Sequence, residues 1–354
     1  MGMPSISITF TELAATAIKR GERGIIAMIL KDTTVPDTNP AVCVSNEDVP
    51  ATLTKDNQEQ IKLALMGYVN TPKRVIAYIL KDNAEDYTEA LNYFKTVRFD
   101  YLVVPTVETD EKKDDIVSYV KTQRAAKKLI KAVLPNTVGD NEAIINFATQ
   151  FMKKNDKTYT TEQYCSRIAG VIAGTPLTMS CTYAPLSELT DCQRLTQEEM
   201  DAAEEAGKFI VWWDGEKVKT GRGVNSFTTL TNLKNTQFQK VKIVEAMDMI
   251  SNDIRMTIED SYIGKYANTY DNKCLLISAI GNYFDQLIQA DVIQSYTLGI
   301  DIDMNRMYLK GRGKDVDSMT EFKVKTANTG SYVYLICKAY LLDAIEDVVF
   351  RISI

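Results

Sequence analysis

Short apolar runs alternate with amphipathic stretches over the first 135 residues of the chain. The run "GIIAMILKD" (24–32) is nearly repeated by "RVIAYILKD" (74–82), and both are apolar at almost every position before a charged end. Runs that are apolar on both faces and separated by helices are typical of a mostly parallel sheet with helices on each side. The pattern predicts an α/β fold, with further strands at 99–106 and 128–135 and helices at 56–69, 84–97 and 112–124.

The pattern changes near residue 230. The preceding part is completed by helices at 161–173 and 196–207 and by the hairpin "KFIVWWDGEKVKTGRG", whose turn is Asp214–Gly215. Two long amphipathic helices (237–262 and 272–290) and two strands (296–303 and 332–341) follow. We therefore expect an α/β domain at 21–230 and an α+β domain at 231–341, flanked by terminal arms at 1–20 and 342–354.

Each arm carries a strand pattern without an evident partner. Apolar residues alternate with other residues in both, at Val348, Phe350, Ile352 and Ile354 and at Ile6, Ile8 and Phe10. One interpretation is that the arms fold back into their own sheet. The other is that each is donated to a neighbouring copy by strand addition. The receiving residues would then be Leu298, Ile300, Ile302, Tyr332, Tyr334 and Ile336.

The energetics of a donated C-terminal strand are nearly balanced. Burying its four apolar side chains gains roughly 6–12 kcal/mol, and ordering its seven residues costs about 7–14 kcal/mol before hydrogen bonds are counted. Such a strand would bind only when several contacts form together. A head-to-tail donation that does not close on itself produces a helical polymer.

Composition argues against several functional classes. The 354 residues include no histidine, which removes the commonest general base and metal ligand. The six cysteines form no C-x-x-C pair, so a metal cage or a disulfide framework is not expected. A net charge of −6 without a basic run disfavours nucleic-acid binding. No apolar stretch approaches the ~20 residues that cross a bilayer, and no signal peptide is visible, so we expect synthesis in the cytoplasm without membrane insertion.

Two motifs suggest ligand binding, and both have simpler interpretations. The loop "TGRGVNS" (Thr220–Ser226) is rich in glycine like a phosphate-binding loop, but it lacks the P-loop lysine and follows a hairpin. An α/β enzyme or binding protein for a phosphorylated small molecule is therefore the alternative function. The stretch "DIDMN" begins like a calcium loop, yet Arg306 stands where glycine is required. Its acids are expected to form the polar face of a strand.

Several segments together resemble the contractile tail sheath proteins of myophages and R-type bacteriocins. They are "RIAGVIAGTPLTMS", "AGKFIVWWDGEKVKTGRGVNSFTTL", the helix ending in "IGKYAN", and the C-terminal strand. The similarity runs from about Arg167 to the C-terminus, while the first 150 residues resemble the family only in layout. Ser226 departs from the family's commoner threonine. The compact length is similar to that of clostridial sheaths of the diffocin type.

The resemblance implies a structural protein with no catalytic residues, metal or cofactor. Sheath subunits form six-fold rings stacked helically around an inner tail tube, between a baseplate and a collar or terminator. Their arms complete the sheets of neighbouring subunits, and contraction drives the tube through a cell envelope. The particle would be extracellular after release by lysis. Candidate tube-facing residues are Lys234, Lys240, Lys242 and Lys265, which could equally form a solvated surface.

Overall fold

The computed structural model describes Ile18 and residues 23–353. The predicted arm residues Ile6, Ile8, Phe10 and Ile354 lie outside this part of the chain. The chain divides into two units, one formed by Gly21–Met249 with Asp343–Ile354, and the other containing Ile250–Leu342. The division falls inside a helix, about twenty residues after the boundary expected from the sequence.

The first unit, which we call the α/β unit, is built on a seven-stranded sheet in the order β10-β6-β5-β4-β1-β3-β2. Every neighbouring pair is parallel except β2 with β3, so the prediction of a mostly parallel sheet is confirmed. The strands are β1 (Ile25–Asp32), β2 (Ala41–Cys43), β3 (Arg74–Lys81), β4 (Tyr101–Val103), β5 (Lys131–Pro135), β6 (Ile144–Phe147) and β10 (Lys208–Phe209).

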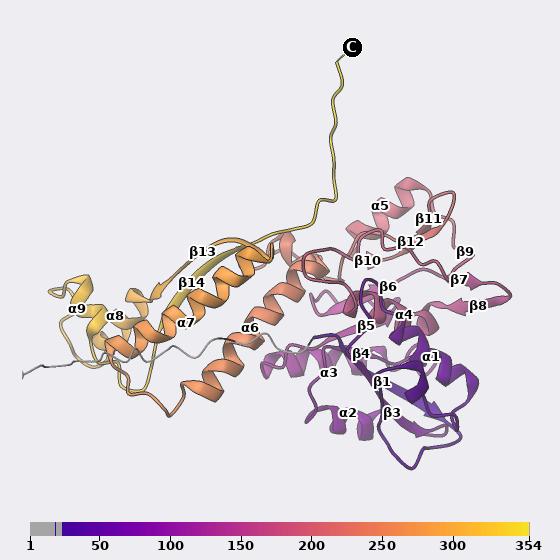
Figure 1. Cartoon of the computed structure of the whole chain (residues 1–354), viewed down its shortest axis with the longest axis horizontal. Helices are drawn as coiled ribbons and strands as arrows, with labels where there is room; N and C mark the ends of the chain where they lie inside the picture. The colour runs from indigo at the N-terminus through magenta and orange to yellow at the C-terminus, as the bar shows by residue number, and fades with distance from the viewer. Residues whose placement is uncertain (1–17, 19–22, 354) are drawn as a thin grey trace, which may run out of the picture. The chain divides into compact units, whose positions relative to one another are not determined.

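Helices cover both faces of this sheet (Figure 1). Along β1, Ile26 and Met28 belong to one apolar cluster while Ile25 and Ala27 belong to another, because successive side chains of a strand point to opposite faces. The first cluster includes residues of α1 (Lys55–Leu65) and α4 (Thr161–Ala173). The second includes residues of α2 (Thr88–Phe94) and α3 (Lys113–Ala125). Burial on both faces explains why the strand sequences are continuously apolar.

The α/β unit also contains the predicted hairpin and several smaller elements. Strands β11 (Val211–Trp213) and β12 (Val218–Thr220) are antiparallel, and the Asp214 carboxylate accepts the backbone N–H groups of Glu216 and Lys217 in the turn. A three-stranded sheet is formed by β7 (Phe151–Lys154), β8 (Lys157–Thr160) and β9 (Asp191–Cys192). The acidic helix is α5 (Gln197–Glu205), and two short 3₁₀ helices lie at Asn46–Asp48 and Thr236–Gln239.

The second unit, which we call the helix–hairpin unit, contains the end of α6 (Val241–Ser261) and all of α7 (Tyr270–Gln289). Strands β13 (Ile293–Ile300) and β14 (Leu335–Leu341) pair antiparallel as a two-stranded sheet. Helices α8 (Ile302–Gly311) and α9 (Glu321–Thr326) lie between them in the sequence. The first nine residues of α6 belong to the α/β unit, so this helix is shared between the units.

The predicted strand at 296–303 needs a correction. The strand begins earlier and ends at Ile300, and Ile302 is the first residue of α8. The reason is local, because the Asp301 carboxylate accepts the N–H of Met304 and caps the helix. Asp301 and Asp303 therefore do not form the polar face of a strand, as the "DIDMN" pattern had suggested. Tyr332 and Tyr334, predicted within the second strand, precede β14.

Candidate intersubunit surfaces

The start of the C-terminal arm is fixed to the α/β unit by charged and polar contacts. Arg222 donates two hydrogen bonds to the Asp347 carboxylate, at 2.7 and 3.0 Å, which is the paired geometry that suits guanidinium and carboxylate. Glu346 accepts the Thr182 hydroxyl at 2.5 Å and pairs with Lys240 at 3.2 Å. Lys240 also contacts Asp343. We call these contacts the arm anchor.

Electrostatics agree with this geometry. The hydrogen bond from Arg222 lowers the pKa of Asp347 below its usual value. Burial by itself would lower the pKa of Lys240, but its contacts with Asp343 and Glu346 raise it. Both shifts favour the charged forms at neutral pH, so the arm anchor is held together by ion pairs under physiological conditions.

Arg222 lies in the glycine loop that the sequence singled out as a phosphate-binding candidate. All seven backbone N–H groups from Thr220 to Ser226 already donate within the chain, to Ala184, Ile210, Glu204, Thr182, Arg222, Gln239 and Ile144 in turn. A Cβ atom on Gly221 would lie 2.8 Å from Ile210, and one on Gly223 would lie 3.0 Å from Cys181. These glycines serve close packing, and the loop has no backbone donors left for a phosphate.

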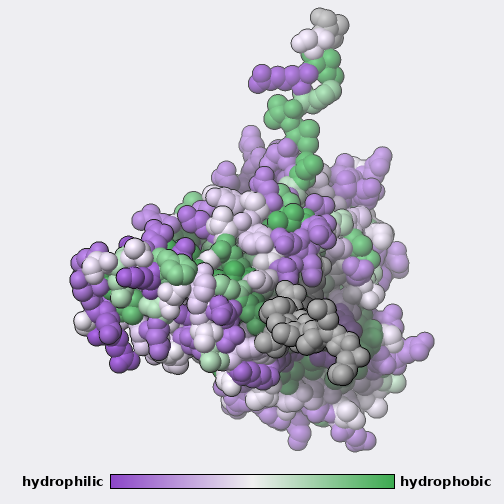
Figure 2. Space-filling model, turned by 60° about the vertical axis from the view of Figure 1, so that its left-hand side comes forward, coloured by the Kyte–Doolittle hydropathy of each residue, from purple (hydrophilic) through white to green (hydrophobic). Residues whose placement is uncertain are grey.

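Beyond the anchor, the arm is exposed on both faces. Val348, Phe350 and Ile352 are 77%, 81% and 73% exposed, and Val349 between them is also exposed. The segment has no strand pairing in the part of the chain that the structure describes. Figure 2 shows its apolar side chains along the segment that rises at the top. A run of large apolar side chains in water normally marks a surface that another molecule covers.

The two-stranded sheet of the helix–hairpin unit is the second open surface. Helix α7 packs on β13, where the Tyr296 ring stacks on Phe284 at 4.9 Å and its hydroxyl donates to the Gly281 carbonyl. Most of β14 is exposed, including Ile336. Within the described residues the sheet has two strands, so each has an edge without a strand partner. Such edges are ready to pair with another chain.

The predicted receiving residues are distributed over three kinds of structure. Leu298 and Ile300 lie in β13 and Ile336 lies in β14, and the register pairs Leu298 with Cys337 and Gly299 with Ile336. Ile302 is helical. The rings of Tyr332 and Tyr334 stack on each other at 5.9 Å in the segment before β14.

The four lysines proposed to face a tube are placed differently from one another. Lys234 pairs with Glu142 at 2.8 Å, and Lys240 belongs to the arm anchor. Lys242 is buried, and burial lowers its pKa. Lys265, in the helix–hairpin unit, is exposed and its ammonium group contacts the Asp260 carbonyl. Three of the four are thus in the α/β unit, and the sequence had not indicated their partners within the chain.

A buried ion network holds the beginning of α6 in the α/β unit, and sequence reasoning missed it. Glu245 pairs with Arg23 at 2.7 Å and with Lys131 at 2.8 Å, and it accepts the hydroxyl of Tyr101. Burial raises the pKa of Glu245, but Lys131 and Arg23 outweigh it and lower the pKa to about 2. One signal was available, since Lys131 is a charge within the otherwise apolar strand β5.

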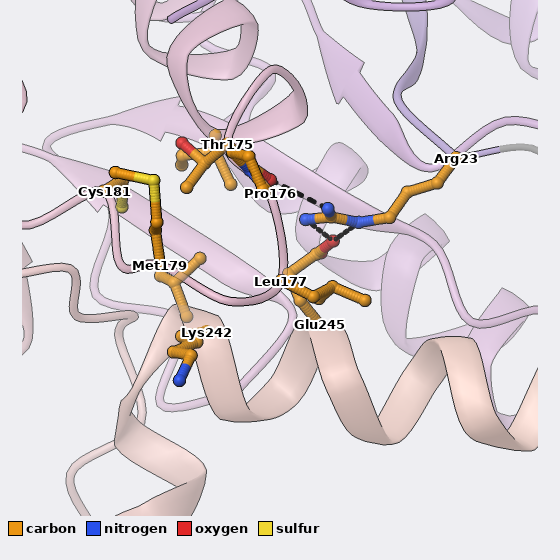
Figure 3. Close-up of a pocket in the computed structure, with 10 residues that line it drawn as sticks. Arg23, Thr175, Pro176, Leu177, Met179, Cys181, Lys242 and Glu245 are labelled. Atoms are coloured by element: carbon orange, nitrogen blue, oxygen red, sulfur yellow. Dashed lines mark hydrogen bonds and ion pairs between the residues drawn. The ribbon is translucent and has the colours of Figure 1, made fainter. Parts of the chain in front are cut away.

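Asp248, one helical turn further along α6, extends the network. It pairs with Lys131 at 2.8 Å and with Arg124 at 2.8 Å. Figure 3 shows Arg23 bound both to Glu245 and to the Thr175 carbonyl, beside a small pocket. The volume of that pocket is about 10 Å³, the space of one water molecule, so it offers no room for a larger ligand.

Two absences were found among the described residues. These residues contain no cluster of three or more cysteine, aspartate or glutamate side chains placed to hold a metal ion. Among the same residues, no helix combines the length and the hydrophobicity that a bilayer crossing requires.

Comparison with known proteins identifies the family. Residues 81–226 match the family model of the phage tail sheath protein central domain, and residues 233–354 match that of the phage tail sheath C-terminal domain. The tail sheath protein of Clostridium phage phiCD119 is 38% identical over 358 residues, which covers 99% of both chains. The chain belongs to the phage tail sheath family. Its role is therefore that of a structural sheath subunit and not that of an enzyme.

Solved structures agree on the fold. The sheath tail protein of Desulfitobacterium hafniense superimposes with a TM-score of 0.75 at 19% identity, covering 97% of this chain and 98% of that one. The helical sheath of the anti-feeding prophage in its contracted state gives a TM-score of 0.72 at 11% identity, covering 100% and 99%. The mixed α/β fold with its parallel-rich sheet is thus shared with sheath proteins of contractile particles.

Proposed function

We propose that this sheath subunit polymerises around an inner tail tube and contracts to drive the tube through a cell envelope. The observation that carries the proposal is the C-terminal arm, which is anchored at Asp343–Asp347 and exposes apolar side chains from Val348 to Ile352. A fixed start and an unpaired, apolar end suit a segment whose partner is another molecule. The family supplies the context, because sheath subunits work as assemblies.

In this assembly the arm adds a strand to the two-stranded sheet of a neighbouring subunit. The edges of β13 and β14 offer backbone hydrogen bonds, and the apolar side chains of the arm gain burial. Burying the four apolar side chains of the arm would stabilise the contact by roughly 6–12 kcal/mol, at ~1.5–3 kcal/mol each. They are Val348, Phe350, Ile352 and Ile354. Ile6, Ile8 and Phe10 would be donated in the same way from the other end.

Donation from one copy to the next is a heterologous contact, so it propagates into rings or helices. We propose six-fold rings stacked helically, which meet a baseplate at one end and a collar or terminator at the other. The domain formed by 231–341 faces the tube, with Lys265 as the exposed candidate contact, and the α/β domain at 21–230 faces outward. The subunit is made in the cytoplasm, and the assembled particle is extracellular after lysis.

In contraction, the α/β unit and the donated strands have different roles. The α/β unit has a completed core and moves as a rigid body, while the donated strands keep neighbouring subunits linked. The extended sheath is metastable, and new contacts between outer domains in the contracted state supply the free energy.

Deleting Val348–Ile354 tests the proposal. The truncated chain should remain folded and monomeric, because Val348, Phe350 and Ile352 are exposed in the subunit, and it should form no sleeves or tail-like particles by negative-stain microscopy. A matched control is the substitution of Arg351 and Ser353 by alanine, which keeps the apolar residues and should still assemble. A truncated chain that unfolds would mean that the strand pairs within its own subunit.

A further inference from the structure

A large pocket opens in the helix–hairpin unit where α6 ends and α7 begins. Its volume is about 720 Å³, which is within the range of ligand-binding sites. The walls come from the end of α6, the α6–α7 turn, the start of α7 and the segment before β14. The residues used below are Ile263, Asn268, Lys273 and Val333.

Lys273 is a buried cation in the wall of this pocket. The residue is 3% exposed, and its ammonium group has only long hydrogen bonds to neutral oxygens, at 3.3 Å to Thr329 and 3.4 Å to the Ala327 carbonyl. No carboxylate of the described residues forms an ion pair with it. Burial lowers its pKa, with no acidic neighbour to offset the effect. A buried ammonium group without a counter-ion is costly, so this position favours a carboxylate from beyond the described residues.

Asn268, which also lines the pocket, carries an unsatisfied acceptor. Its amide nitrogen donates to the Gly330 carbonyl at 2.7 Å and to the Tyr332 carbonyl at 2.9 Å. These acceptors fix the orientation of the amide, since the oxygen could not take the place of the nitrogen there. The amide oxygen is buried and accepts no hydrogen bond from the described residues. A visiting backbone N–H would satisfy it.

The rim of the pocket is apolar and continuous with the open sheet. Ile263 is 65% exposed, and Val333 is also exposed. Val333 lies two residues before β14 begins. A rim of this kind fits a protein segment better than a small polar molecule. The occupant therefore combines an apolar stripe that reaches the sheet with a carboxylate at the end of that stripe.

One segment of the chain has this chemistry. In the N-terminal arm, Ile6, Ile8 and Phe10 fall on one face of a strand pattern, and the next residue on that face is Glu12. At ~3.3 Å per residue, the Glu12 position lies roughly 7 Å beyond Phe10. When this apolar stripe is buried against a sheet, the Glu12 carboxylate at its end needs a basic partner.

We propose that the pocket receives the N-terminal segment of a neighbouring copy, with the Glu12 carboxylate on Lys273 and a backbone N–H of that segment on the Asn268 amide oxygen. This rests on the proposed function, in which the N-terminal strand is donated to the β13–β14 sheet. The pocket adjoins the start of β14, so the donated strand places its acidic end at the buried lysine. The contact fixes the register of the strand, because a shift of one residue would move Glu12 to the other face.

A binding assay with synthetic peptides tests the pocket. The probe is a fluorescent peptide of residues 4–15, PSISITFTELAA, and its partner is the full chain carrying Glu12→Gln, in which the resident segment lacks the carboxylate. Fluorescence anisotropy should show binding of this peptide, and at least tenfold weaker binding of the same peptide with Glu12→Gln. Adding Lys273→Met to the protein should weaken binding of the glutamate peptide at least tenfold and remove its advantage over the glutamine peptide.

Lys310→Met in the same background is the matched control, since Lys310 is an exposed lysine of α8 in the same unit, and it should leave peptide binding within twofold. Lys273→Met should keep or raise the thermal midpoint, because it removes an unpaired buried charge. Equal binding of the two peptides, or binding that survives Lys273→Met, would overturn the proposal. So would a Lys273→Met subunit that assembles normally but no longer binds tubes, because the pocket would then serve the tube. Failure of sheath assembly on deleting Val348–Ile354 is a separate result, because the peptide assay needs no polymer.

Discussion

Strands β1 and β14 differ by only one residue in length, but they differ strongly in how far their side chains are buried. In β1 almost every residue is buried, between helices that cover both faces of the sheet. In β14 the five central residues are exposed, and the strand has a single partner within the described residues. Two-stranded sheets are marginal in water, so this pair needs the support that α7 gives by packing on β13. The α/β unit has a covered core within the described residues, whereas under the proposed function the helix–hairpin unit is completed by assembly.

Charged groups show the same difference. In the α/β unit the buried acids Glu245 and Asp248 are each paired with two basic residues. In the helix–hairpin unit Lys273 is buried with no acidic partner among the described residues. A protein that folds alone rarely leaves a buried charge unpaired. We interpret paired charges as the sign of a finished core and the unpaired lysine as the sign of an interface.

The largest expected effect comes from breaking the buried network. Glu245→Ala leaves Lys131 and Arg23 short of one partner, and such losses typically cost about 3–5 kcal/mol. Urea unfolding followed by tryptophan fluorescence is the measurement, because Trp212 and Trp213 are the only tryptophans and both lie in the α/β unit.

The control is Glu259→Ala, an exposed position in the second half of the same helix, which should change the unfolding free energy by less than about 0.5 kcal/mol. A similar loss for both variants would show that the network adds nothing specific. The free energy of unfolding of the α/β unit would then not depend on the pairing of its buried charges.

Acid should weaken the α/β unit through the same residue. The pKa of Glu245 is lowered from 4.5 to about 2 in the folded state, so its contribution is present above pH 4.5 and is lost as the pH falls towards 2. The difference corresponds to about 3 kcal/mol. Urea midpoints measured between pH 6 and 2.5 should fall, and Glu245→Gln should flatten that dependence. An unchanged slope in the glutamine variant would assign the acid sensitivity to other carboxylates.

The sequence predicted the α/β unit better than the helix–hairpin unit, for physical reasons. Strands buried on both faces leave continuous apolar runs, so β1 and β3 could be placed within one residue of their ends. Asp301 was harder, because the alternation from Leu298 to Met304 fits a strand while the capping carboxylate begins a helix. The family resemblance was visible because its segments lie in contiguous stretches of the chain, and the comparisons confirm it.

The contacts of the candidate surfaces could not be predicted, because they join residues far apart in the sequence. Lys131 and Asp248 are separated by 117 positions, and Arg222 and Asp347 by 125. A charge in an apolar strand signals a buried partner, but only the fold identifies it. For the exposed arm, alternation indicated a strand and a missing partner, while its anchor on the glycine loop had no signal in the sequence.

The smallest expected effect on stability, with a distinct effect on assembly, comes from the arm anchor. Arg222→Ala removes the paired hydrogen bonds to Asp347, and because both groups are partly solvated the unfolding free energy should change by less than about 1 kcal/mol. Assembly should suffer more, because a loosened arm pays additional ordering entropy when its strand is donated. Sleeve yield by sedimentation should fall, and the loss should grow between 50 and 300 mM salt as the remaining Lys240 pairs are screened.

Arg222→Lys keeps the charge but not the two-pronged geometry, so its yield should lie between those of the wild type and the alanine variant. Exchanging the two charges, with Arg222→Asp and Asp347→Arg in one chain, should recover part of the yield. If the alanine variant assembles as well as the wild type, the arm needs no fixed start, and the helix–hairpin unit alone decides where the strand binds. If the alanine variant fails to fold, Arg222 is needed for the fold of the loop that contains it. The arm anchor would then belong to the core of the α/β unit and not to the assembly surface.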